Sequence, residues 1–149
     1  MNIRDTPKHK IILAFTTAIL FLAAWPASGL APLLFFALIP LLLLENAVFQ
    51  TKINHSKSRL FPYSYLTFLL FNIFNTWWIW YASPFGMFGA VAANALLMTI
   101  TFQFFHLTRL KFGNGIGYTS LPIYWVAFEY FHLDWDLSWT WLNFGNGFA

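Results

Sequence analysis

The 149-residue sequence contains no cysteine. Within these residues there is therefore no disulfide framework, no thiolate metal site and no cysteine nucleophile. Charged residues are also scarce, at 9% of the chain, where a soluble domain carries about 25%. The hydrophobic fraction is 59% and the aromatic fraction is 22%. A chain of this length cannot hide so much apolar surface from water, so the composition excludes an ordinary soluble domain and indicates a membrane protein.

The lysines and arginines predict how the chain is oriented in the membrane. They fall in three groups, which are Arg4, Lys8 and Lys10; Lys52, Lys57 and Arg59; and Arg109 with Lys111. Short loops rich in these residues stay in the cytoplasm, and the alternating connections at residues 25–32 and 83–86 contain neither type. We therefore place the N-terminus in the cytoplasm and the segment after Phe131 on the opposite side. We interpret the basic residues as topology signals and lipid-headgroup contacts. Because they form no basic stripe, they do not indicate a nucleic-acid partner.

The apolar runs predict an all-α fold, a polytopic transmembrane helix bundle of about five spans. The first two runs, at residues 11–25 and 30–44, are short for a hydrocarbon core of about 30 Å. They form either two spans or one short hairpin, and the charge pattern is compatible with both. Longer spans follow at residues 63–82, 85–107 and 115–131. A secretory signal peptide is the alternative for the N-terminus, but a clean cleavage site is missing and a second apolar run follows at once.

Small and polar residues within the spans predict which faces are buried. The third span turns one face toward protein, formed by Asn72, Asn75 and Thr76. The fourth span has a small-residue face that predicts the close approach of another helix, formed by Gly86, Gly89, Ala90 and Ala93. Asn94 and Thr101 continue near that face, so we expect it to be buried. The glycines in residues 113–117 lack the spacing of a phosphate loop and predict a flexible connector.

Glu129 lies within the fifth predicted span. Together with Trp125 and His132 it forms a stripe at helical spacing, which predicts that it faces the bundle interior or a water-filled pocket. Two interpretations stay open: a functional carboxyl group, or a structural one that is hydrogen-bonded to Asn72 or Asn94. The remaining histidines show no ligand-like grouping and are predicted to be ordinary loop or helix-end residues: His9, His55 and His106.

The tryptophans are distributed unevenly between the two sides of the membrane. With the orientation above, seven of the eight fall at or beyond the outer ends of the spans: Trp25, Trp77, Trp78, Trp80, Trp135, Trp139 and Trp141. Interfacial anchoring explains most single tryptophans, because an indole is stable at the headgroup level. The one-sided distribution also predicts that the outer end holds something amphipathic, either a lipid ligand or a covering domain.

The C-terminal third carries two specific motifs. Residues 121–130 read Leu-Pro-Ile-Tyr-Trp-Val-Ala-Phe-Glu-Tyr, and residues 139–145 read Trp-Thr-Trp-Leu-Asn-Phe-Gly. They resemble the Pro-x-x-Trp-x-x-x-Glu and Phe-Pro-Trp-Leu-x-x-Gly patterns of bacterial apolipoprotein N-acyltransferases. The Trp25-Pro26 turn, the run that ends in Glu45 and the tryptophans before Phe85 also follow in the order of that family. The sequence departs from the family pattern at Thr140, Asn146 and His132-Leu133.

The resemblance implies a role in lipoprotein synthesis at the bacterial inner membrane. Members of the family transfer an acyl chain from a phospholipid to the α-amino group of the diacylglyceryl-cysteine of a lipoprotein, through a thioester on a catalytic cysteine. Their nitrilase-like domain, with its Glu-Lys-Cys triad, has no counterpart in these residues. We therefore expect residues 1–149 to be the N-terminal transmembrane domain, inactive alone, which anchors the enzyme and helps to admit lipid. No cofactor or metal ion is expected.

The candidate substrate-binding residues are Trp141, Trp139, Glu129 and Trp77. The expected partners are phospholipid, lipoprotein and the bilayer itself. The alternative is a non-enzymatic polytopic membrane protein, such as a transporter half or an accessory subunit. In such a protein Asn72, Asn94 and Glu129 would line a polar pathway.

The predicted orientation can be tested with single cysteines, since the sequence has none of its own. We expect Asp134→Cys to react with an impermeant thiol reagent in intact cells, because the segment after Phe131 faces outward. Ser56→Cys should react only after permeabilisation, because it lies in a basic cytoplasmic loop. Strong labelling of Ser56→Cys together with none of Asp134→Cys in intact cells would reverse the orientation.

Overall fold

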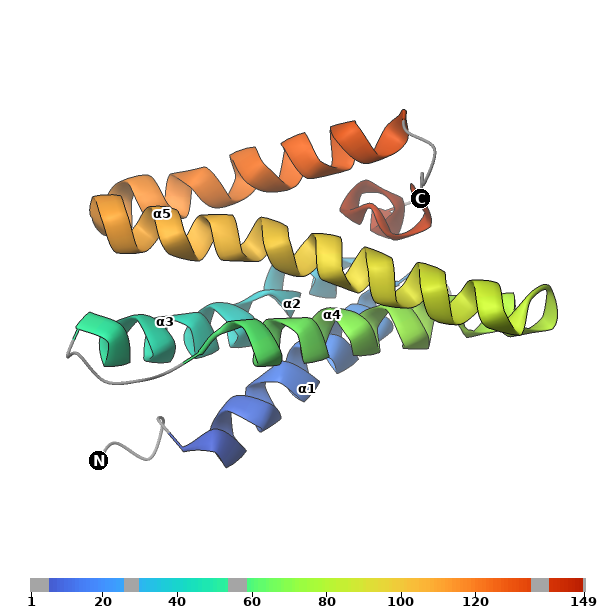
Figure 1. Cartoon of the computed structure of the whole chain (residues 1–149), viewed down its shortest axis with the longest axis horizontal. Coiled ribbons are helices and arrows are strands. Elements are labelled where there is room, and N and C mark those ends of the chain that lie inside the picture. Colours follow the sequence, from blue (N-terminus) through green and yellow to red (C-terminus); the bar gives the residue numbers. More distant parts are fainter. Residues whose placement is uncertain (1–5, 26–29, 54–58, 135–139, 149) are drawn as a thin grey trace.

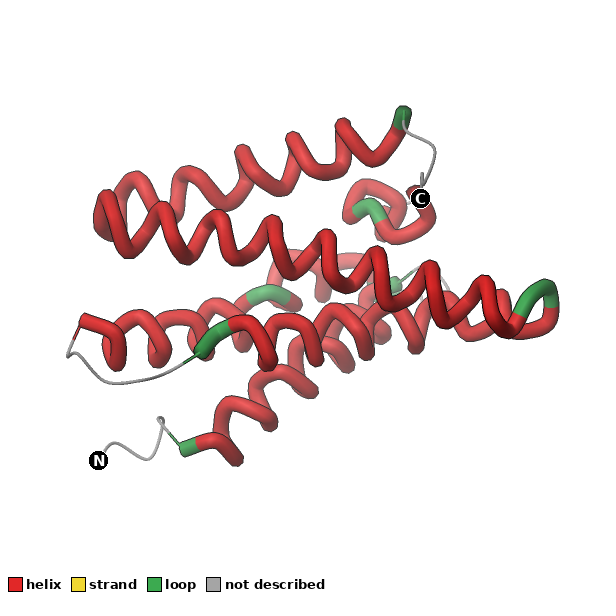
Figure 2. Tube along the Cα trace, viewed as in Figure 1, coloured by secondary structure: helices red, strands yellow, loops and turns green. Residues whose placement is uncertain are grey.

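The computed structural model describes residues 6–25, 30–53, 59–134 and 140–148, and every regular element among them is a helix (Figures 1 and 2). Most of the helices run along the long axis of the molecule (Figure 1). The prediction of an all-α membrane protein is thereby confirmed in its class. The end of the helix at residues 39–53 and the reversal that follows residues 109–111 lie at the same end of the bundle (Figure 1).

The first two apolar runs form separate helices. Helix α1 (Pro7–Ala24) begins after Thr6, whose hydroxyl accepts a hydrogen bond from the His9 N–H at 3.4 Å. The second run begins with the 3₁₀ helix η2 (Ala31–Leu33) and the single turn α2 (Leu34–Ala37), and it continues as α3 (Ile39–Ile53). Pro40 lies in the first turn of α3, where its missing N–H leaves no helical hydrogen bond unmade.

Among the described residues after α3 there are one short and one very long α-helix. Helix α4 (Phe61–Thr76) tightens into the 3₁₀ helix η3 (Trp77–Tyr81), and α5 (Pro84–Leu133) follows. Helix α5 is interrupted at Gly113, where φ is 81° and the chain reverses direction (Figure 1). We call residues 84–112 the first leg of α5 and residues 114–133 its second leg. Two 3₁₀ helices, η4 (Thr140–Leu142) and η5 (Phe144–Phe148), end the described chain.

The prediction of five separate spans is wrong in its count. Three helices of the described residues are long and apolar enough to cross a membrane: Pro7–Ala24, Ala31–Thr51 and Pro84–Leu133. Helix α4 has only 16 residues before its helical turns tighten. The fourth and fifth predicted spans belong to one element, because the reversal at Gly113 takes a single residue in the left-handed region that glycine tolerates. The glycine cluster is thus a tight turn and not a flexible connector.

Aromatic side chains fill the core where α1, α4 and α5 meet. Phe21 of α1 packs against Phe71 of α4, with 4.8 Å between ring centroids. Phe68 of α4 in turn meets Phe102 of the first leg at 6.1 Å, and all four rings are fully buried. Outward-facing apolar side chains such as Phe35 and Ile123 are exposed, which suits contact with lipid tails.

The small-residue face of the fourth predicted span is not buried as expected. Asn94 and Thr101 are buried as expected, but Gly89 and Ala93 are exposed, and no atom lies within 4 Å of a Cβ placed on Gly89. The first leg has 29 residues and the second 20, counted from their bounds, so the first leg extends about 13 Å beyond the second. Several of its small residues therefore lie past the end of the second leg. The close approach occurs at Gly117, where a Cβ would lie 2.6 Å from Cβ of Arg109.

Gly117 offers a direct test of the packing between the two legs. We expect Gly117→Ala to destabilise the protein by about 1–3 kcal/mol, because the added methyl group meets the backbone and side chain of Arg109 and forces the legs apart. The matched control is Gly115→Ala, where no atom lies within 4 Å of the new methyl group. Thermal unfolding in detergent, followed by circular dichroism, measures both. Equal unfolding temperatures for the two variants would show that the legs do not pack as described.

Candidate functional site

The stripe of Trp125, Glu129 and His132 faces inward, as predicted. Trp125 and His132 are buried and Glu129 is half-buried. The carboxyl atom Oε1 of Glu129 accepts two hydrogen bonds, one from Trp125 Nε1 at 2.9 Å and one from the backbone N–H of Phe144 at 2.7 Å. The second donor belongs to a different element, so Glu129 connects the second leg of α5 to the C-terminal segment.

Asn72 and Asn94, the partners suggested for a structural Glu129, do not bond to it. Those two amides bond to each other instead, with Asn94 Nδ2 2.7 Å from Asn72 Oδ1. Asn72 Nδ2 also donates to the Phe68 carbonyl at 2.7 Å, which holds the pair inside the core. Glu129 accepts its hydrogen bonds from Trp125 and Phe144, so Asn72, Asn94 and Glu129 are not joined by hydrogen bonds. The polar pathway of the alternative interpretation is therefore not supported by these contacts.

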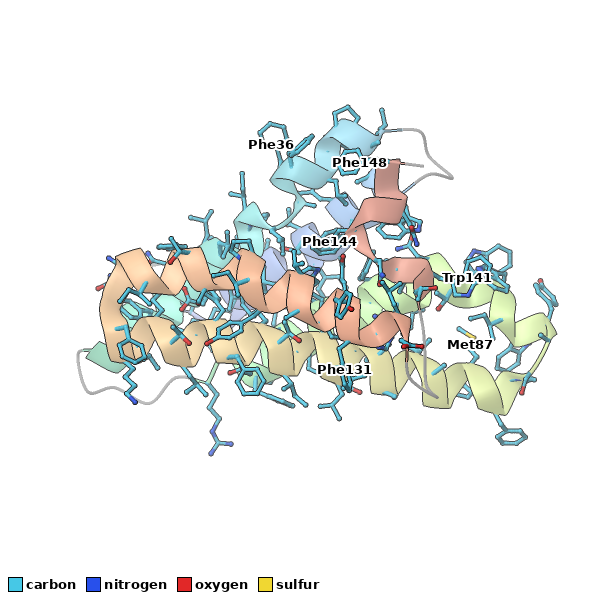
Figure 3. The ribbon with its side chains drawn as sticks, turned by 90° about the horizontal axis from the view of Figure 1, so that it is seen from above. Phe36, Met87, Phe131, Trp141, Phe144 and Phe148 are labelled. Carbon is cyan, nitrogen blue, oxygen red and sulfur yellow. The ribbon has the colours of Figure 1, made fainter. Side chains whose placement is uncertain are left out.

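The C-terminal segment, residues 140–148, folds back onto the bundle and ends beside α2 (Figures 1 and 3). The ring of Phe144 stacks on Trp125 with 4.5 Å between centroids and 15° between planes, and it lies 5.1 Å from Phe21. Leu142 is buried, and so is Gly147, which packs against Leu34. The segment is therefore a packed part of the domain.

Exposed tryptophans gather at the end of the bundle opposite the basic groups. Trp141 is 62% exposed, and its ring meets Trp78 edge to face at 5.5 Å. Trp77 is 56% exposed and packs on Tyr81 at 6.0 Å. Figure 3 shows Trp141 at the same end of the molecule as Met87. Trp139 lies outside the described residues. The structure thus brings Trp141 to η3, while Glu129 lies deeper and touches Phe144.

An apolar groove of about 560 Å³ lies between the two legs of α5. Its walls come from both legs and include Leu97 and Phe104 on one side and Tyr124 and Phe131 on the other. The Tyr124 hydroxyl is 2.9 Å from the Thr108 hydroxyl, so the one polar group of that ring is already satisfied. The volume falls within the usual range for small-molecule sites, about 300–1,000 Å³. The groove suits an aliphatic chain and offers little to a polar ligand.

A buried charge cluster at the opposite end escaped the sequence analysis. Glu45, His106 and Arg109 are all buried. His106 Nδ1 lies 2.6 Å from Glu45 Oε1, and Arg109 Nη1 donates to Glu45 Oε2. Arg109 also donates to Asn46 Oδ1 at 2.7 Å and to Asn114 Oδ1 at 3.0 Å. The guanidinium is therefore neutralised by one carboxylate and bonded to two amides.

Two predictions about this cluster are wrong. Arg109 is not a lipid-headgroup contact, because it lies inside the protein with its guanidinium 3.9 Å from the centroid of the Phe49 ring and 4.7 Å from that of Tyr118. His106 is not an ordinary helix-end residue. The available signal was Glu45, an acid at the end of a long apolar run that requires a partner. Its partners are 61 and 64 residues away in sequence, so no local sequence pattern predicts them.

Removal of one partner should expose the energetic weight of this cluster. We expect Glu45→Ala to destabilise the protein by about 3–5 kcal/mol, because Arg109 would be left as an uncompensated buried charge. The control is Lys111→Ala, since Lys111 is an exposed cation two residues from Arg109. Unfolding in detergent measures both. The double variant with Arg109→Met should recover part of the loss, whereas a Glu45→Ala variant as stable as the control would contradict the role of the pair.

The chain is similar in sequence to proteins of one known family. The family model described as apolipoprotein N-acyltransferase N-terminal domain matches residues 17–149. An apolipoprotein N-acyltransferase from Chlorobaculum tepidum is 30% identical over 127 residues, which cover 84% of this chain and 22% of that relative. The chain therefore spans about a fifth of the length of the curated relative that it matches. No solved structure matches it. Because the family model covers nearly the whole chain, the protein belongs to the apolipoprotein N-acyltransferase family through that family's N-terminal domain.

Proposed function

We propose that this chain is the membrane portion of an enzyme that transfers an acyl chain from a phospholipid to the N-terminal diacylglyceryl-cysteine of a lipoprotein. The observation that carries the proposal is the family match over residues 17–149, together with three helices suited to a membrane. Acyl transfer through a thioester requires an activated thiolate. The 149 residues contain no cysteine. Their proposed part is to anchor the enzyme and to guide its lipid substrates.

The groove between the legs of α5 supports a lateral route for lipid. Its walls are almost entirely apolar, and they lie on an element that is long and apolar enough to cross a membrane. An acyl chain in this groove would exchange contacts with other lipid tails for contacts with Leu97, Phe104 and Phe131, at little cost in polar groups. We therefore assign the groove to the acyl chain of the donor phospholipid on its way to the outer end of the bundle.

We call the end of the bundle with the exposed residues Trp77, Trp78, Trp80 and Trp141 the aromatic end. It is the proposed place where lipid headgroups are held. An indole suits it because its apolar body can lie against acyl chains while its N–H reaches a headgroup oxygen. Trp141 and Trp77 expose more than half of their surface there. Trp139 is proposed for the same role from its position beside Trp141 in the sequence. We place this end in the periplasm and the end with Arg109 and Lys111 in the cytoplasm of the bacterial inner membrane.

Replacement of Trp141 tests its proposed contact with lipid in the full-length protein. We expect Trp141→Ala to lower the rate of lipoprotein N-acylation about three- to tenfold, since an aromatic contact is worth about 0.5–1.5 kcal/mol. Trp78 is unsuitable as a control because its ring touches Trp141. Trp80→Ala is the matched control, because Trp80 is an exposed indole at the same end that packs on Phe88. At equal levels of folded protein, equal rates for the two variants would remove Trp141 from the substrate site.

A further inference from the structure

Glu129 uses a single oxygen to join two elements. The Trp125 indole lies one helical turn before it, and the N–H donated at 2.9 Å fixes the direction of the carboxylate. The same oxygen then accepts the N–H of Phe144 at 2.7 Å. Phe144 is the first residue of η5, and the first N–H groups of a helix have no partner within that helix. Glu129 therefore caps a helix that is 15 residues away in sequence.

This bond is the polar link between the C-terminal segment and the rest of the described chain. The other hydrogen bonds of residues 140–148 stay within the segment, such as Asn146 Nδ2 to the Thr140 carbonyl at 2.7 Å. Within residues 6–25, 30–53, 59–134 and 140–148, no other hydrogen bond ties the segment to the bundle. The remaining contacts are apolar, and apolar contacts fix a segment's direction less strictly than a hydrogen bond does.

The bond sets the position of Trp141 through two neighbouring residues. Phe144 is stacked on Trp125 with 4.5 Å between ring centroids. Leu142, which lies between Trp141 and Phe144 in the sequence, is buried. Three residues before Phe144, Trp141 remains exposed and meets Trp78 at 5.5 Å. If Phe144 loses its acceptor, the stack can slide and Trp141 moves with it. The exposed indole thus depends on a carboxylate that it does not touch.

We propose that Glu129 is a positioning residue, whose carboxylate oxygen fixes the C-terminal segment so that Trp141 lies beside Trp78 at the aromatic end. The proposal deepens the proposed function and rests on it for the effect on acylation. It is an alternative to direct substrate binding by Glu129, because Oε1 already accepts hydrogen bonds from Trp125 and Phe144. A positioning acceptor needs an oxygen and no charge. A ligand for a cationic headgroup, or an acid or base, needs the charge or the proton.

Two substitutions of Glu129 distinguish a positioning role from a role that needs the charge or the proton. Glu129→Gln keeps an oxygen that can accept from both donors, so the positioning role survives it. Glu129→Leu fills similar space without an acceptor and leaves the Phe144 N–H without its partner. A residue that acts on substrate through its charge would fail in both variants. The pair therefore distinguishes an acceptor from a charge.

The geometry can be measured without any activity. Cysteines replace Trp78 and Trp141 in the membrane-embedded chain, which has no cysteine of its own, and a short bifunctional thiol reagent joins them. We expect efficient cross-linking with Glu129 and with Glu129→Gln, and about tenfold less with Glu129→Leu, as for one lost hydrogen bond to a charged group. A control pair, Trp80→Cys with Phe88→Cys, lies outside the segment and should cross-link equally in all three backgrounds. Loss of cross-linking in Glu129→Gln, with the control pair intact, overturns the proposal.

Acylation by the full-length protein provides the second readout. We expect Glu129→Leu to raise KM for phospholipid about tenfold with a smaller change in kcat, and Glu129→Gln to keep both near the parent values. If Glu129→Gln cross-links normally but loses acylation, Glu129 acts on substrate through its charge and the positioning role is wrong. If cross-linking follows the expectation while acylation is unchanged in both variants, the positioning of Trp141 is supported and the substrate role of the aromatic end is refuted.

Discussion

The ion pair between Arg109 and Glu45 is the interaction on which the arrangement of the helices depends. A charge inside a membrane protein is tolerated only when it is paired and its hydrogen bonds are made. Arg109 meets that condition through Glu45 and Asn46 of α3 and through Asn114 of the second leg. One side chain of the first leg thereby holds α3 and both legs of α5 together. Loss of the Arg109 side chain would therefore remove contacts between all three of these segments.

The position of the second leg follows from this anchor. Gly113 permits the reversal because a positive φ carries no steric cost for glycine. Gly117 then lies directly against Arg109, so the two legs approach closely at that point. A helix is a stiff element, and its register at the turn sets which residues face inward further along. Trp125 and Glu129 point into the bundle for that reason, at a distance from the charge cluster that fixes the leg.

The two ends of the bundle therefore have different tasks. At one end the carboxylate of Glu45 pairs with the buried side chains of His106 and Arg109, which gives rigidity. At the other end the tryptophans are exposed, and the C-terminal segment packs beneath Trp141 through Phe144. Between the ends, the groove of α5 is apolar and matches the surrounding lipid. This division is compatible with the proposed function, in which lipid substrates are held at the end that carries the exposed tryptophans.

The sequence by itself determined the class of the protein, its family and the inward stripe at Trp125, Glu129 and His132. These features rest on composition, on motifs and on helical periodicity, which are local properties of the chain. Only the tertiary structure decided the partners of Glu45 and Glu129, the burial of Arg109 and His106, and the exposure of Gly89. Each of these depends on which distant segments meet. The partners of Glu45 lie more than 60 residues away, and Gly89 is exposed because one leg of α5 is longer than the other. The tertiary structure likewise narrowed the predicted connector at residues 113–117 to a reversal at Gly113, because one glycine with a positive φ is enough to turn the chain.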